Sequence, residues 1–298
     1  MTSGERFALG SMVAGCLVLG LKGAAWWLTG SAALYSDALE TTVNVAASLL
    51  AWLAIRFASR PADENHPYGH DKAEFFAAVV EGLLIVIAAV LIFSEAWLAW
   101  QHPRPIGLPF EGIGLNAVAT VINAGWSMVL LSAGRRLRSV ALEADGRHLF
   151  ADVVTSAGIA VGMILAVSTG RLVLDPLLAA ATGLYVLWSG VGMISKSVSG
   201  LMDTAPEPAV MERIKELLAD SAAGAIEAHD LRTRHAGKLT FLDFHLVVPG
   251  SMTVAAAHAI CDRIEASLKA EMGHLMITIH VEPEEKAKPG SVVVVPRV

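Results

Sequence analysis

Six long runs of apolar residues occupy the first two thirds of the chain, and each could cross the roughly 30 Å hydrocarbon core of a bilayer as a helix. They lie near 7–28, 32–58, 73–100, 113–133, 148–169 and 174–194. Lys22 interrupts the first run, which has no signal-peptide cleavage pattern and is therefore predicted to be a retained span. The pattern predicts an α-helical membrane bundle of six transmembrane helices.

The connections between these runs differ in their content of Lys and Arg. One side of the predicted membrane carries Arg6, Arg60, Lys72, Arg135, Arg136, Arg138, Arg147 and Lys196, whereas the other carries only Arg104 and Arg171. Because basic residues concentrate on the cytoplasmic side, we predict a multi-pass protein of the plasma (inner) membrane with both termini in the cytoplasm.

After Met202 the pattern becomes that of a small soluble domain. Apolar residues recur at helical spacing in 208–219 and 253–268, and three segments read as strands, at 228–235, 238–248 and 275–281. The order helix, strand, strand, helix, strand predicts an α+β domain close to half of a ferredoxin-like fold. We therefore expect a membrane domain at 1–202, a cytoplasmic domain at 203–285 and a flexible tail at 286–298.

Composition narrows the function classes. The chain is 54% hydrophobic and only 17% charged, against about 25% charged residues in a typical soluble domain. A net charge of −6 argues against a nucleic-acid partner. Cys16 and Cys261 are too few for a disulfide framework or a thiolate-rich metal site. No Gly-rich phosphate loop is evident in the sequence, so we reject an ATP-driven pump and expect no enzymatic activity.

Two polar pairs interrupt the apolar runs: Glu40 with Asn44, and His148 with Asp152. Each pair has i,i+4 spacing and so presents its side chains from one helical face. Ionisable groups inside a membrane are costly and usually face a partner, a cavity or a transported ion. The four side chains could therefore form a divalent metal site, although Asn44 could instead hydrogen-bond a neighbouring helix. Asp37, three residues before Glu40, is a candidate supporting residue, entry-path residue or ligand.

Further sequence motifs resemble those of a known protein family. The connection after the second run reads Pro61-Ala-Asp-Glu-Asn-His-Pro-Tyr-Gly-His-Asp-Lys-Ala-Glu74. Other matching segments are Ser36-Asp-Ala-Leu-Glu40, His148-x-x-x-Asp152 and Ala228-His-Asp-Leu-Arg-Thr-Arg234. Together they resemble the cation diffusion facilitator family of metal efflux transporters. The resemblance implies a homodimeric metal/proton antiporter in the lipid bilayer, with a cytoplasmic domain of metallochaperone-like fold.

The resemblance also implies the site residues. The transport site corresponds to Glu40, Asn44, His148 and Asp152, where relatives most often carry Asp or His in place of Glu40 and Asp in place of Asn44. A neutral amide in place of a carboxylate leaves the preferred ion open, with zinc or iron(II) favoured by mixed nitrogen and oxygen ligands, then manganese, with cobalt and cadmium to be tested.

Two more metal sites and a charge pair follow from the same resemblance. Asp63, His66 and His70 are predicted to bind metal in the loop, the alternative being a solvated polar turn. The cytoplasmic domain is predicted to bind metal through five residues, some of which could instead be ordinary surface residues: His229, His245, His258, His280 and Glu282. Strand alternation puts His280 and Glu282 on one face. Lys72 and Asp203 resemble a charge interlock at the cytoplasmic interface.

Ligand chemistry suggests the mechanism. Metal binding requires deprotonated ligands, so a metal and protons compete for one site and their exchange can be driven by the proton gradient. We expect metal export by alternating access. The competing hypothesis is a metal-responsive membrane sensor or assembly protein with weak or vestigial transport, in which the metal is a regulatory ligand.

Overall fold

The computed structural model describes residues 2–102, 108–171, 173–236, 239–273, 275–288 and 293–294. The chain divides into two compact units, Met1–Val198 and Ser199–Val298, which are described separately below.

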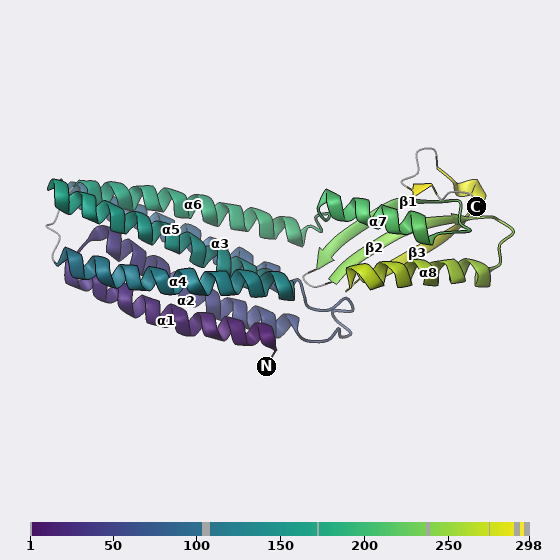
Figure 1. Cartoon of the computed structure of the whole chain (residues 1–298), viewed down its shortest axis with the longest axis horizontal. Helices are drawn as coiled ribbons and strands as arrows, with labels where there is room; N and C mark the ends of the chain where they lie inside the picture. The colour runs from purple at the N-terminus through teal and green to yellow at the C-terminus, as the bar shows by residue number, and fades with distance from the viewer. Residues whose placement is uncertain are drawn as a thin grey trace. The chain divides into compact units, whose positions relative to one another are not determined.

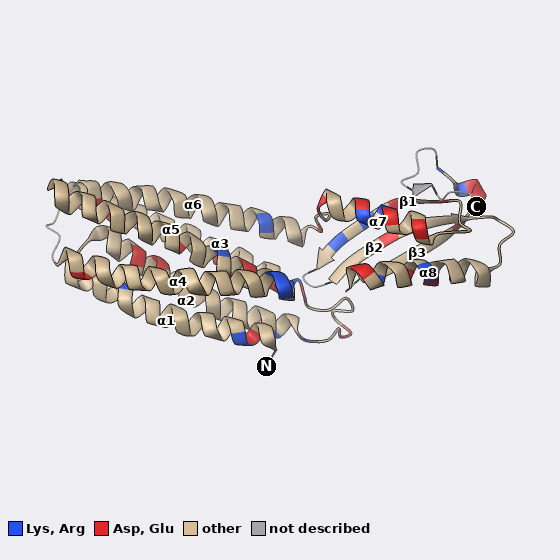
Figure 2. Ribbon diagram, viewed as in Figure 1, with Lys and Arg blue, Asp and Glu red and all other residues tan. Residues whose placement is uncertain are grey.

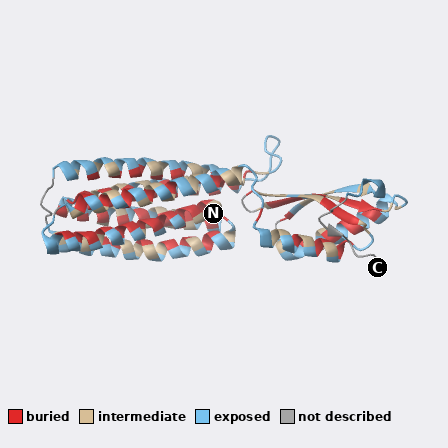
Figure 3. Ribbon diagram, turned by 90° about the horizontal axis from the view of Figure 1, so that it is seen from above, coloured by how far each residue is buried: buried red, intermediate tan, exposed pale blue. Residues whose placement is uncertain are grey.

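The first unit is built from long helices that run side by side (Figure 1). They are α1 (Ser3–Thr29), α2 (Ala32–Ala58), α3 (Ala73–Gln101), α4 (Pro109–Leu137), α5 (Val140–Thr169) and α6 (Leu174–Leu201). All six are long and apolar enough to cross a membrane, so the described residues contain the predicted number of spans. Figure 2 shows few charged residues along these helices, and Figure 3 shows buried residues gathered between them.

Helix α5 is longer than its apolar run predicted. It begins at Val140, where the Ser139 side chain accepts a hydrogen bond from the Leu142 N–H and caps the helix. The sequence suggested a start at His148 because the preceding turns contain charged residues. One of them, Asp145, is nevertheless fully buried and accepts a hydrogen bond of 2.6 Å from Ser11 Oγ on α1. A buried partner therefore keeps a polar segment helical.

Small residues allow close approach of α3 and α6. A Cβ atom on Gly82 of α3 would lie 2.6 Å from the Ile194 side chain, and one on Gly190 of α6 would lie 2.9 Å from the Ile85 side chain. Helices in membranes commonly pack through such small residues. Lipid tails are as apolar as the helix surfaces, so close packing and not the burial of apolar area drives the helices together.

The second unit is an α+β domain. Its elements are α7 (Pro208–Ser221), β1 (Glu227–Ala236), β2 (Leu239–Val248), α8 (Val254–Met272), β3 (Leu275–Pro283), the short helix η1 (Glu284–Lys286) and β4 (Val293–Val294). The sheet order is β3-β2-β1-β4, with β1 antiparallel to β2 and β2 parallel to β3. The predicted order of helix, strand, strand, helix, strand is confirmed, while the turn at 237–238 lies outside the described residues.

This unit has its own hydrophobic core. Ile214 and Leu218 of α7, Ile264 of α8, and Leu242 and Phe244 of β2 are buried together between the helices and the sheet. Within the predicted tail, β4 pairs with β1, whereas 289–292 and 295–298 lie outside the described residues. Such a core is what an independently folding domain requires.

Candidate metal centres

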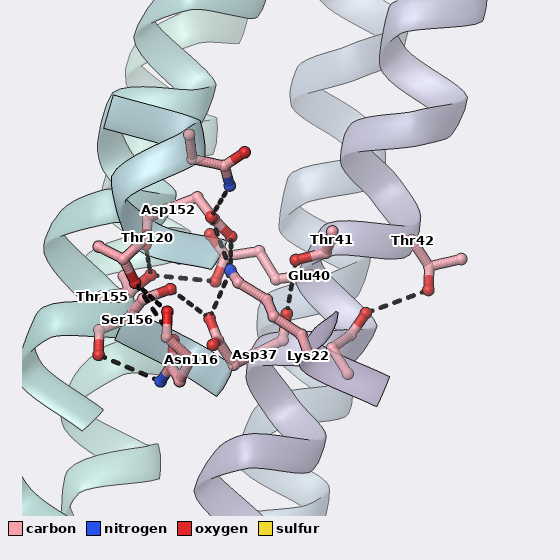
Figure 4. Close-up of polar contacts among 12 residues, drawn as sticks. Lys22, Asp37, Glu40, Thr41, Thr42, Asn116, Thr120, Asp152, Thr155 and Ser156 are labelled. Atoms are coloured by element: carbon pink, nitrogen blue, oxygen red, sulfur yellow. Dashed lines mark hydrogen bonds and ion pairs between the residues drawn. The ribbon is translucent and has the colours of Figure 1, made fainter. Parts of the chain in front are cut away.

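Three carboxylates meet between α2 and α5. Asp37 and Glu40 extend from α2 and Asp152 from α5, and each offers an oxygen within 4.8 Å of the others. All three side chains are buried, and Figure 4 shows them converging. We call these three residues the membrane acid cluster. It unites two of the predicted ligands, Glu40 and Asp152, with Asp37.

A lysine from α1 lies inside this cluster. The Lys22 Nζ is 2.9 Å from Asp37 Oδ1, 2.8 Å from Asp152 Oδ1 and 2.7 Å from Asp152 Oδ2. Lys22 is fully buried, and Figure 4 shows its ammonium group between the two aspartates. Sequence reasoning treated Lys22 only as an interruption of the first span. A lysine deep in an apolar run was the signal that could have placed it in the site, since such residues pair with acids.

Neutral side chains hold the carboxylates in place. The Ser156 Oγ donates to Asp37 Oδ1 at 2.7 Å, and the Asn123 Nδ2 on α4 donates to Asp152 Oδ2 at 2.5 Å. Thr155 Oγ1 lies 3.4 Å from Glu40 Oε2. Sequence reasoning did not single out these residues because their types are common in membrane helices. The centre therefore draws side chains from α1, α2, α4 and α5.

Asn44 and His148 lie one helical turn from the cluster along α2 and α5, as their spacing predicts. Both are buried, and within the described part of the chain the amide atoms of Asn44 and both ring nitrogens of His148 have no hydrogen-bond partner. Buried polar atoms without partners are rare and call for a ligand, an ion or water. The structure thus leaves the amide oxygen of Asn44 and the imidazole of His148 available to a ligand or an ion.

The loop residues also come together. His66 Nδ1 lies 3.2 Å from Asp63 Oδ1, and His70 Nε2 lies 3.3 Å from Asp63 Oδ2. Gly69, with φ of 88°, makes the turn that brings His70 back toward Asp63. The hydrogen bond that the His66 backbone N–H donates to Asp63 Oδ1 holds the pKa of the Asp63 carboxyl below its usual range, so this group stays ionised. This arrangement can hold a cation by one oxygen and two nitrogens.

In the α+β unit, His229, His245 and Glu282 form a third group. The His229 Nε2 is 3.3 Å from Glu282 Oε2, and the His245 Nδ1 is 3.3 Å from Glu282 Oε1. His229 on β1 and His245 on β2 are paired in register. Glu227 supports the group from behind, with its Oε1 3.0 Å from His229 Nδ1, an orienting contact typical of metal-ligating histidines.

Two predicted members of this site are not in the group. His280 is in register with His245, but its ring is 65% exposed and its Nε2 lies 3.6 Å from Glu282 Oε1. His258 is 75% exposed on α8, with its Nε2 3.6 Å from Asp262 Oδ1. Strand alternation predicts the face of the sheet on which a residue lies. It does not predict whether that residue is buried, as His229 is, or exposed, as His280 is.

Charged residues around the third group include Asp230 and Lys288. The Lys288 ammonium lies 2.6 Å from Asp230 Oδ2, and this contact holds the pKa of Asp230 below its usual range.

Asp203, one partner of the predicted charge interlock, has its Oδ1 3.8 Å from Arg234 Nη1. The interlock between Lys72 and Asp203 would join the two units, and it stays a prediction.

Comparisons with known proteins match two family models to this chain. The family model of the cation efflux transmembrane domain matches residues 9–202, and that of the cytoplasmic domain of cation efflux proteins, a dimerisation domain, matches 206–284. The chain is 40% identical over 282 residues to Uncharacterized transporter sll1263 of Synechocystis sp., covering 95% of this chain and 91% of that protein.

Two further likenesses differ in extent. Cation-efflux pump FieF of Yersinia pestis is 32% identical over 279 residues, covering 93% of this chain and 91% of that protein. A solved structure of CzrB in its Zn form is 45% identical and covers 29% of this chain and 99% of its own, with a TM-score of 0.28. The two family models span most of the chain, and the first contains the membrane acid cluster; the chain therefore belongs to the cation diffusion facilitator family of multi-pass cation-efflux transporters, with a cytoplasmic C-terminal domain.

Proposed function

We propose that this transporter exports divalent transition-metal ions in exchange for protons, and that the exchange takes place at the membrane acid cluster. The observation that carries the proposal is the convergence of Asp37, Glu40 and Asp152, all buried, from two membrane-spanning helices. Carboxylates at membrane depth are costly and are kept where they face an ion pathway. Three of them at one point provide the negative charge that a divalent cation needs.

The donor atoms favour a transition metal. Oxygen donors come from the membrane acid cluster, and His148 adds an imidazole whose two nitrogens have no partner among the described residues. Mixed oxygen and nitrogen ligation suits zinc and iron(II), then manganese. Asn44 can add a neutral oxygen, which lowers the negative charge of the site relative to a carboxylate at that position.

Protons couple to metal through the same ligands. A carboxylate or imidazole binds metal only when it is deprotonated, so protons arriving from one side release the ion and metal binding releases protons. The distribution of Lys and Arg in the connections supports an orientation in the plasma (inner) membrane with both termini in the cytoplasm. Metal then leaves the cell as protons enter, by alternating exposure of the centre.

The cytoplasmic domain supports a homodimer, because its family model is that of a dimerisation domain. We propose that the loop residues Asp63, His66 and His70, and the group at His229, His245 and Glu282, bind the same metals as regulatory or structural ligands. Neither group lies in the membrane acid cluster, so their loss should alter control of transport more than the transport step itself.

Reconstituted proteoliposomes test the transport step. A pH gradient is imposed and uptake of zinc, iron(II), manganese, cobalt and cadmium is measured, with release of protons followed in parallel. Asp152→Asn should lower flux by at least about tenfold, the usual scale for loss of a metal ligand or its support. Asp175→Asn is the matched control, because Asp175 is also a buried aspartate in a span but caps α2 through Ser31 Oγ at 2.7 Å.

The outcomes separate two functions. Metal-dependent proton release that Asp152→Asn abolishes and Asp175→Asn preserves supports the antiporter. If purified protein binds metal but moves none across the membrane under any gradient, the chain acts as a metal-responsive sensor or assembly protein instead. Flux that survives Asp152→Asn unchanged would show that the ion follows another route.

A further inference from the structure

Lys22 is an unusual component for a cation site, because it brings a positive charge to the place where the metal must bind. Its Nζ contacts both oxygens of Asp152 and one oxygen of Asp37, at distances of 2.7 to 2.9 Å. It comes from α1, whereas the carboxylates come from α2 and α5. The side chain is fully buried, so no solvent shares its charge.

The charge count gives Lys22 a consequence for the ion. With their carboxylates ionised, as metal ligation requires, Asp37, Glu40 and Asp152 carry three negative charges. The ammonium group of Lys22 neutralises one of them, which leaves two. A divalent cation then brings the centre to neutrality, and charge that is left unbalanced in a buried site is strongly unfavourable.

The available lone pairs show where the ion and Lys22 compete. Among the described residues, Asp37 Oδ2 and Glu40 Oε1 have no hydrogen-bond partner. Asp152 differs, since Lys22 contacts both of its oxygens and Asn123 donates to Oδ2. An entering ion therefore finds free oxygens on α2 but an ammonium group at the carboxylate of α5.

We propose that Lys22 sets the metal affinity of the membrane acid cluster: it is a tethered cation that competes with the metal at Asp152 and reduces the negative charge offered to the ion from three to two. The inference rests on the proposed function. When metal binds, the ammonium group leaves Asp152 and stays with Asp37. A lysine suits this role because its charge is compact and its four-carbon stem is flexible, whereas the planar fork of an arginine favours one fixed geometry.

The consequence is a site that binds divalent ions moderately and releases them. Without Lys22, three carboxylates would hold the ion more tightly and release it more slowly. Without Asp37, the ammonium group would remain, and the centre would carry an excess positive charge once metal is bound. Removing both should return the charge balance of the parent.

Metal affinity of the full-length protein tests this directly. The probe is zinc alone, measured by equilibrium dialysis of protein in lipid nanodiscs, in a background carrying Asp63→Ala and Glu282→Ala so that the membrane centre dominates. Relative to this parent, Lys22→Met should bind zinc at least about tenfold more tightly, and Asp37→Asn at least about tenfold more weakly. The double variant Lys22→Met/Asp37→Asn should lie within about threefold of the parent.

The double variant also protects the test against misfolding. Lys22→Met leaves buried carboxylates without their cation, and if it does not accumulate, the comparison of the double variant with Asp37→Asn decides. A double variant that binds zinc no more tightly than Asp37→Asn overturns the proposal. A merely structural lysine predicts that Lys22→Met weakens binding and that Asp37→Asn does not rescue it.

Asp152→Asn in the same background separates this proposal from the proposed function. If Asp152→Asn leaves zinc affinity unchanged, the membrane centre itself is wrongly placed, and the Lys22 proposal fails with it. If Asp152→Asn removes binding while Lys22→Met and the double variant both bind as the parent does, the centre stands and only the competing role of Lys22 is refuted.

Discussion

Asp37 lies seven residues before Asn44 on α2, so the two side chains project from one helical face about two turns apart, with Glu40 between them. The sequence motif led us to count two acidic ligands, Glu40 and Asp152, with an amide at Asn44. The structure adds the Asp37 carboxylate on the other side of Glu40, together with Lys22 as its partner. The neutral amide of Asn44 is thus accompanied by an additional carboxylate at Asp37.

Asn44→Asp tests whether the amide takes part in ion choice. The substitution adds a negative charge one turn from Glu40, so we expect the ranking of zinc, iron(II), manganese and cadmium fluxes, or their pH dependence, to change more than the maximum flux. Asn116→Asp is a matched control, because Asn116 is also buried but its amide reaches the Ser156 carbonyl at 3.5 Å. If every ion behaves as in the parent, Asn44 lies outside the coordination shell.

His148→Ala separates a ligand from a structural residue. The His148 ring nitrogens make no hydrogen bond to the described residues, so the substitution removes no polar contact seen there and costs only about 1–3 kcal/mol of stability through lost packing. We expect metal flux to fall at least about tenfold while the protein still folds in the membrane. Flux assays and thermal unfolding of the same preparation check both parts, and normal flux in folded protein would remove His148 from the site.

At the scale of elements, two carboxylates cap helices other than their own. Glu74 of α3 accepts hydrogen bonds from Ser139 Oγ at 2.6 Å and the Ala141 N–H at 3.1 Å, at the start of α5. Asp175 of α6 accepts from Ser31 Oγ at 2.7 Å and the Ala32 N–H at 3.1 Å, at the start of α2. The helices that carry the membrane acid cluster are therefore each fixed at one end by a neighbour.

Glu74→Ala should destabilise the first turns of α5 by about 1–2 kcal/mol, the usual effect of removing a helix cap. Hydrogen exchange should rise in residues 140–147 and change little in the other described helices. Glu111→Ala provides the comparison, since Glu111 is an exposed acid in the first turn of α4. Equal exchange rates in α5 for both variants would mean that Ser139 alone caps the helix.

These elements also show what the sequence could predict. Apolar runs of membrane length predicted the helical bundle, and strand alternation in the C-terminal third predicted the α+β domain. Both patterns are regular because the residues are buried against lipid or in a core. The pattern did not place Lys22 beside Asp152, since that contact depends on how α1 packs against α5. It did not extend α5 to Val140 either, because the partner of Asp145 is a serine of another helix. Such contacts depend on tertiary packing.

At the scale of the whole molecule, three groups of candidate ligands differ in their surroundings. The membrane acid cluster is buried and paired with the Lys22 ammonium group, the loop group at Asp63 is largely exposed, and the group at His229 is supported by Glu227 in a sheet. A buried ammonium group makes binding in the membrane a competition, while the other two groups need only lose water or protons. We therefore expect the loop group and the group at His229 to load metal over a different concentration range from the membrane acid cluster.

The cytoplasmic domain allows these groups to be measured apart. Because residues 199–298 form a compact unit with a separate core, we expect this segment to fold alone, to dimerise and to bind zinc. The buried position of His229 leads us to expect that His229→Ala weakens zinc binding at least about tenfold, whereas His280→Ala, at an exposed ring, changes it by less than about threefold.

Calorimetric titration of the isolated segment decides between the two histidines. His258→Ala is the control, because His258 is exposed on α8 beside Asp262 and is not in the group with Glu282. A larger loss for His280→Ala than for His229→Ala would place the metal on the outer side of Glu282, where a second copy of the domain could complete its shell. Equal titrations for the parent and His229→Ala would mean that Glu227 and His229 form only a structural hydrogen bond.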